Sequence, residues 1–176
     1  ASKWIYANVP MGSVLTGESW DDLIPVPLGP LLTSEDNQYT VIPLDIYGDR
    51  PQEDVSDYLW NQLQSADFVV QSSNRLRESV ATEPWRYPVQ IAYYNLLDSG
   101  QLGWTLVADF QTEPEIFGYE FDDGLGDESW VNYDHPRVRI YQKTSQIDRA
   151  TWDSLFADAV ASPWTVSRLD PSQDSL

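Results

Sequence analysis

Short apolar runs alternate along this chain with longer segments in which apolar residues recur at helical spacing. The short runs predict strands, the clearest of them at residues 13–16, 39–42, 67–70, 104–110 and 137–143. We expect the second strand to stop near Pro43, because proline cannot donate to a central ladder. Strands that alternate with helices are typical of α/β domains. We therefore expect a compact three-layer α/β/α, Rossmann-like domain whose mainly parallel sheet has about five strands.

The clearest predicted helix covers residues 51–65, where one face carries Val55, Tyr58, Leu59 and Leu63. A second helix is expected over residues 88–99, with Gly100 at its end, and a third is expected to begin at Asp148. Ser2 is expected to cap a short first helix, which Pro10 stops. Residues 1–169 should form one domain, and residues 170–176 should form a disordered tail.

Composition and charge then narrow the classes of function. The chain has 10 Lys and Arg against 28 Asp and Glu, a net charge of -18, so it repels nucleic-acid phosphates. With 41% hydrophobic residues it can still build a core. It has no cysteine, and its single histidine excludes a multi-histidine metal site. The chain begins without Met, so we expect it to be part of a longer polypeptide or a processed product.

Polar side chains follow three of the predicted strands. Ligands of open α/β sheets bind beyond the carboxyl ends of parallel strands, so we expect these side chains to meet at one edge. They could hold a sugar, with Trp20 stacking on its ring, or an oxygen-ligated cation. The alternative is structural: the aspartates satisfy turns, and Arg75 neutralises one of them. The candidate ligand-binding residues are Glu18, Trp20, Asp21, Asp22, Asp45, Ser73, Asn74, Arg75 and His135.

His135, next to Asp134, could act as an acid or base, or could belong to a turn before a strand. A stand-alone metal-dependent hydrolase using Asp21, Asp22 and His135 is therefore one alternative function. An aromatic-rich module that binds carbohydrate or a protein partner is another, with Trp20, Trp85 and Trp130 as its exposed rings. The acidic loop at residues 122–128 departs from calcium-loop spacing, and we expect it to be solvated.

Several segments in order resemble one family. They are ASKWIY at residues 1–6, PMGSV at 10–14, ESWDD at 18–22, ADFVVQSSNR at 66–75, RYP at 86–88, YY at 93–94, LGWTLVA at 102–108 and YDHPRV at 133–138. This set resembles the soluble C-terminal region of large multi-pass bacterial membrane proteins, the mannosyltransferase-like, lipid-linked-sugar-dependent glycosyltransferases. The resemblance covers about residues 1–144 and leaves out the helix expected after Asp148.

The resemblance implies a domain on the extracytoplasmic side of the cell membrane, tethered through its N-terminus to membrane helices outside this sequence. Catalysis in such proteins uses a carboxylate of the membrane portion, so we expect a non-catalytic domain, without a cofactor, that helps to position a glycan or acceptor. Its expected partners are the membrane-embedded remainder of the parent chain and a glycan or lipid-linked sugar, with no nucleic acid. Ser19 stands where relatives usually carry histidine, which weakens the case for a base at that position.

Overall fold

A computed structural model of the chain describes residues 1–26, 38–111, 115–116, 119–120 and 136–162. The helices of this part are α1 (Ser2–Asn8), α2 (Gln52–Ser65), α3 (Arg75–Thr82), α4 (Pro88–Asp98) and α6 (Arg149–Ala161). The main sheet contains β1 (Val14–Glu18), β2 (Thr40–Leu44), β3 (Phe68–Gln71), β4 (Trp104–Phe110) and β7 (Val138–Lys143). Two short strands, β5 (Glu115–Ile116) and β6 (Tyr119–Glu120), pair separately. No helix in these ranges is both long and apolar enough to cross a bilayer.

The five strands of the main sheet lie in the order β2-β1-β3-β7-β4. β1 pairs in parallel with β2 and with β3, whereas β7 runs antiparallel to both β3 and β4. Four strands therefore share one direction, and β7 runs against them near one side of the sheet. The predicted α/β class and the five-strand sheet are confirmed. The sheet is mixed, however, so it is only loosely Rossmann-like.

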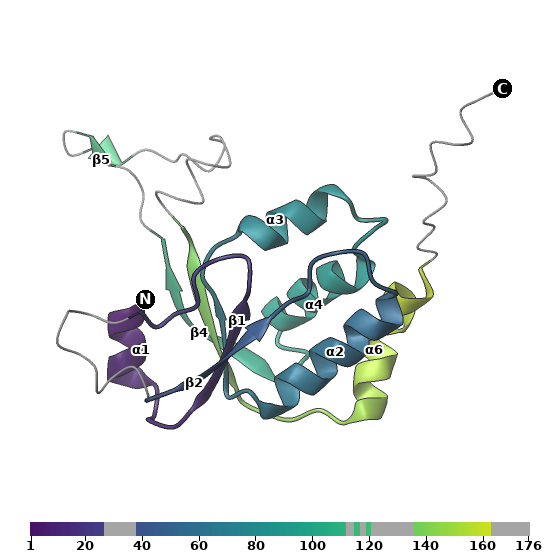
Figure 1. The fold of residues 1–176 in the computed structure, drawn as a ribbon, viewed down its shortest axis with the longest axis horizontal. Coiled ribbons are helices and arrows are strands. Elements are labelled where there is room, and N and C mark those ends of the chain that lie inside the picture. Colours follow the sequence, from purple (N-terminus) through teal and green to yellow (C-terminus); the bar gives the residue numbers. More distant parts are fainter. Residues whose placement is uncertain (27–37, 112–114, 117–118, 121–135, 163–176) are drawn as a thin grey trace.

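The helices cover the two faces of the sheet unequally (Figure 1). One face packs against α2, α3, α4 and α6, and its core includes Leu59, Val69, Tyr93, Tyr141 and Phe156. On the opposite face α1 packs over a smaller core, formed by Ile5, Val9, Leu15, Phe68, Val70 and Ile140. In the described ranges the third layer of the predicted sandwich thus consists of the two-turn helix α1.

Three predicted helices form close to their expected positions. Helix α2 begins after Pro51, and Glu53 and Asp54 lie in its first turn, where the helix dipole favours acids. Helix α4 is followed by Gly100 with φ 76°, a left-handed conformation that suits glycine at a helix end. Helix α6 is capped by Asp148, whose carboxylate accepts a 2.8 Å hydrogen bond from the Thr151 N–H.

Of the local predictions, the end of β2 near Pro43 is confirmed and the Ser2 cap was wrong, while helix α3 was missed. β2 ends at Leu44, one residue after Pro43; it can include this proline because β2 is an edge strand, where a missing N–H on the open side costs no ladder bond. Ser2 lies inside α1 and does not cap it; its hydroxyl instead accepts a 3.1 Å hydrogen bond from the Val26 N–H. Helix α3 was not predicted at all, because a Ser-Ser-Asn-Arg run after a strand looks like a loop.

Candidate functional site

A pocket of about 630 Å³ lies beyond the carboxyl ends of β1 and β3. Because these two strands are parallel neighbours, the segments that follow them meet at one edge of the sheet. Five of the predicted site residues line this pocket, namely Trp20, Asp21, Asp22, Ser73 and Arg75. The prediction that these side chains converge is therefore confirmed, whereas their binding role stays a prediction.

Asp21, Ser73 and Arg75 are bound to one another. The Ser73 hydroxyl donates to Asp21 Oδ2 and accepts a 3.0 Å hydrogen bond from the backbone N–H of Arg75. The Arg75 guanidinium lies 3.9 Å from Asp21 Oδ1. The structural alternative considered for the aspartates thus applies to Asp21, which ties the loop after β1 to the start of α3.

Asp22 differs from its neighbour. Its side chain is exposed and lines the pocket. Asp21 is held by Ser73 and Arg75, so Asp22 is the pocket carboxylate that can accept hydrogen bonds from a ligand with the smallest cost to the fold.

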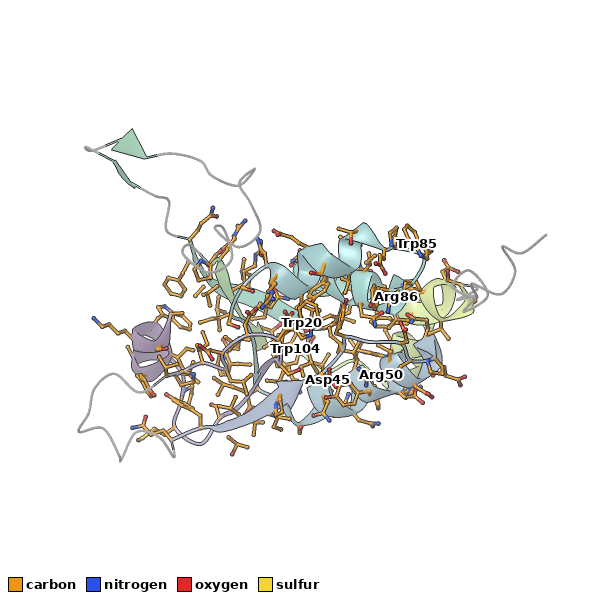
Figure 2. All side chains as sticks on the ribbon, turned by 45° about the horizontal axis from the view of Figure 1, so that its top comes forward. Trp20, Asp45, Arg50, Trp85, Arg86 and Trp104 are labelled. Carbon is orange, nitrogen blue, oxygen red and sulfur yellow. The ribbon has the colours of Figure 1, made fainter. Side chains whose placement is uncertain are left out.

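Trp20 lies in the middle of the molecule and is half-buried (Figure 2). Its ring centroid is 4.0 Å from that of Tyr47 at an interplanar angle of 56°, and the Arg75 guanidinium lies 5.4 Å from the ring centroid. These contacts fix the indole firmly, and they also occupy ring surface that stacking on a sugar would need. Trp20 therefore lines the pocket as a rigid side chain, and the Arg75 guanidinium packs on its ring.

Glu18 does not line the pocket but lies behind it. It is the last residue of β1, its side chain is on the helix-covered face, and it is 2% exposed. The Tyr94 hydroxyl donates a 2.8 Å hydrogen bond to Glu18 Oε1. Burial raises the pKa of Glu18 to about 7, even though the Tyr94 hydrogen bond acts in the opposite direction.

Two further predicted residues lie away from the pocket lining. The Asn74 amide oxygen accepts a 2.7 Å hydrogen bond from Arg139 of β7, so this side chain joins α3 to the sheet. Asp45 is exposed and lies beside Arg50, whose guanidinium donates to the Asp45 carbonyl oxygen (Figure 2). Asp45 follows β2, and β1 lies between β2 and β3 in the sheet. His135 lies outside the described residues.

The sequence pattern missed other lining residues. Ser2 and Val26 reach the pocket because α1 and the segment after Asp22 fold over the same edge of the sheet, joined by the hydrogen bond between Val26 and Ser2. Ser19 and Ser72 also line it. Both serines stand directly beside predicted site residues, so the neighbouring positions were the available signal.

The chemistry of this arrangement favours binding a neutral polar ligand. Serine hydroxyls, the exposed Asp22 carboxylate and the Arg75 guanidinium line the pocket, and they can hydrogen-bond to the hydroxyls of a small molecule. Within the described ranges no group of three or more His, Cys, Asp or Glu side chains could hold a metal ion. The hydrolase alternative depends on His135, outside those ranges.

The alternative function as an aromatic-rich binding module requires Trp20, Trp85 and Trp130 to be exposed together. Trp85 is 60% exposed, and it lies beyond α3 at a distance from Trp20 (Figure 2). Trp20 is half-buried, and Trp130 is outside the described residues. These rings therefore do not form a single aromatic surface in the part of the chain that the structure describes.

Comparison of the chain with family models, with curated proteins and with solved structures gave no match.

Proposed function

We propose that this chain is a non-catalytic, extracytoplasmic accessory domain of a membrane glycosyltransferase-like protein, and that it helps to position a glycan or acceptor. The observation that carries the proposal is the pocket beyond β1 and β3. Its volume of about 630 Å³ is in the range of roughly 300–1,000 Å³ that small-molecule sites occupy. The ordered motifs of the sequence supply the link to glycosyltransferases.

The polar groups of the pocket suit a sugar hydroxyl pattern. Asp22 offers carboxylate acceptors, Ser19 and Ser72 offer hydroxyls, and Arg75 offers guanidinium donors. Carboxylates and guanidinium groups can each engage two adjacent hydroxyls, which gives orientation as well as affinity. We place catalysis in the membrane portion of the parent protein, as the resemblance implies, and give this domain a positioning role.

A glycan array followed by calorimetric titration of the saccharides that bind tests the pocket. We expect Asp22→Asn to weaken binding by about tenfold, because one charge-assisted hydrogen bond is worth about 1.5 kcal/mol. The matched control is Asp45→Asn, which removes an exposed carboxylate that also follows a strand but lies outside the pocket. It should bind as the wild type does.

Two results would contradict the proposal: no saccharide binds, or Asp22→Asn and Asp45→Asn bind equally well. The reading frame that encodes this chain provides an independent test of the parent protein. Membrane helices encoded upstream would support a tethered domain, and a frame without them would contradict it.

A further inference from the structure

Glu18 lies at the junction between the buried polar layer of the molecule and the pocket. Its side chain is in the core, and the residues that follow it, 19–22, line the pocket; we call these four residues the pocket wall. The Tyr94–Glu18 hydrogen bond and the hydrogen bond from Ser73 to Asp21 attach this segment to α4 and to the start of α3. The Ser19 N–H also donates a 3.2 Å hydrogen bond to the Leu44 carbonyl oxygen, and the Trp20 ring packs on Tyr47. A change at Glu18 therefore acts directly on the position of the wall.

The groups around Glu18 do not neutralise a charge on it by direct contact. Arg77 of α3 is bound to Asp98, and Arg139 of β7 is bound to Asn74. They lower the pKa of Glu18 through space only, whereas Asp21 of the wall and burial both raise it. The titratable and charged groups that face Glu18 are Asp21, Arg77, Tyr93, Tyr94 and Arg139.

Gln71 is a further buried polar side chain of this layer. The register that pairs Thr16 with Val69 and Gly17 with Val70 puts Gln71 beside Glu18 on the same face of the sheet. Gln71 is 1% exposed, and neither of its amide atoms has a hydrogen-bond partner in the described part of the chain. A buried amide without a partner means that the hydrogen bonds of this polar layer are incompletely satisfied. Its oxygen can accept from a protonated carboxyl, and its NH₂ can donate to an ionised one.

We infer that the proton on Glu18 controls the position of the pocket wall. With the proton bound, the neutral carboxyl stays in the core beside Tyr94 and holds residues 19–22 in place. When the proton leaves to solvent, a buried negative charge remains close to the Asp21 carboxylate, and the end of β1 moves toward water to hydrate it. As a control on ligand binding this inference rests on the proposed function, but the movement itself requires no ligand.

The test follows two groups of the ligand-free protein between about pH 5 and pH 9 by NMR. One is the ¹³C carboxyl resonance of Glu18, and the other is the indole N–H of Trp20, assigned with Trp20→Phe. We expect Glu18 to titrate with a midpoint at about pH 7 and the Trp20 resonance to move with the same midpoint. Glu18→Gln should abolish the Trp20 transition, whereas Asp45→Asn, at an exposed carboxylate outside the pocket, should leave it intact.

Tyr94→Phe provides a variant that keeps the shape of the core. Because the phenol stabilises ionised Glu18, its loss should shift both midpoints upward together. The inference is overturned if Glu18 titrates in the ordinary range of a carboxyl group, or if Trp20 stays unchanged while Glu18 titrates. The wild-type titration decides this even if Glu18→Gln does not fold. Failure here leaves the glycan titration standing, and the reverse also holds.

Discussion

The hydroxyl of Tyr94 in α4 lies 2.8 Å from a carboxyl oxygen of Glu18 at the end of β1, and this hydrogen bond crosses from the helices to the sheet. Both side chains are buried, at 2% exposure each. A carboxyl group in this position is unusual because burial penalises its charged form. The pair therefore makes the stability of the fold depend on pH in a way that surface carboxylates do not.

We expect the stability conferred by Glu18 to fall as the pH rises. The folded-state pKa of about 7 is above the ordinary value of 4.5, so the folded protein keeps a proton that the unfolded chain has lost. As the pH rises from 4.5 to about 7 the free energy of unfolding therefore falls, and above about pH 7 it levels off. Glu18→Gln removes this dependence, so the stability of the variant relative to the wild type should rise by about 3 kcal/mol from pH 4 to pH 8.

Urea unfolding at a series of pH values measures this difference. Glu53→Gln is the matched control, because Glu53 is an exposed glutamate of α2. Its curve should run parallel to that of the wild type. Parallel curves for Glu18→Gln would show instead that Glu18 is ionised in the fold.

Asp98 should have the opposite pH dependence. Burial acts to raise its pKa, but the hydrogen bonds from Arg77 and Tyr141 and the charge of Arg77 together lower it below 3.8. Its contribution is therefore present above pH 3.8 and is lost as the pH falls through the folded-state pKa. Asp98→Asn should destabilise the protein by about 1 kcal/mol at pH 7, since the site is partly exposed.

Thermal unfolding at neutral and acidic pH checks this expectation, with Asp153→Asn as the control. Asp153 pairs with Arg149 on the exposed surface of α6, and its loss should cost less than about 0.5 kcal/mol. An Asp98→Asn variant that remains less stable than the wild type by the same amount in strong acid would contradict the role assigned to the charge.

Substitution of Gly103 and of Gly12 should show how much stability is lost through a steric clash and how much through a left-handed backbone conformation. Both have positive φ, 80° and 85°, but a Cβ at Gly103 would collide with the Ser145 carbonyl oxygen, whereas a Cβ at Gly12 meets nothing within 4 Å. Gly12→Ala should cost about 1 kcal/mol for the left-handed conformation alone. Gly103→Ala should cost about 3 kcal/mol or more. Equal losses in denaturant unfolding would show that Ser145 moves aside freely.

Helix α6 lies outside the family resemblance, yet it should be an integral part of the domain. The Trp152 indole N–H donates a 3.0 Å hydrogen bond to the Ser56 hydroxyl of α2, and both residues are buried. Ser56→Ala leaves this donor unpaired and should cost about 1–3 kcal/mol. Ser65→Ala, at the exposed end of the same helix, should change stability by less than about 0.5 kcal/mol. If the two variants unfold at the same denaturant concentration, α6 is only loosely attached.

The elements with a strong local period were the predictable part of the fold. Helix α2 shows its buried face in the spacing of Val55, Leu59 and Leu63, and β3 is a continuous apolar run because it is covered on both faces. Helix α3 was missed because it has eight residues and only two buried apolar positions, Leu76 and Val80. The antiparallel placement of β7 could not be predicted, since it depends on pairing between distant segments.

The residues of the site could be predicted only where the order of the strands in the sheet could be predicted. Asp21 and Ser73 meet because β1 and β3 are parallel neighbours, which is the condition on which the predicted site depended. Asp45 follows β2, on the other side of β1, and does not line the pocket. Glu18 stands one residue before the pocket wall, and only the alternation of faces along β1 turns its side chain toward α4.

The position of β7 also determines the order in which the chain can complete its sheet. Among the described strands β4 pairs with β7 alone, and β7 ends at Lys143, more than thirty residues after β4. During synthesis, β1, β2 and β3 can pair as soon as they emerge from the ribosome. The backbone groups of β4 stay unpaired until β7 has emerged. A nascent chain that lacks β7 therefore exposes one unpaired edge of β3 and both edges of β4.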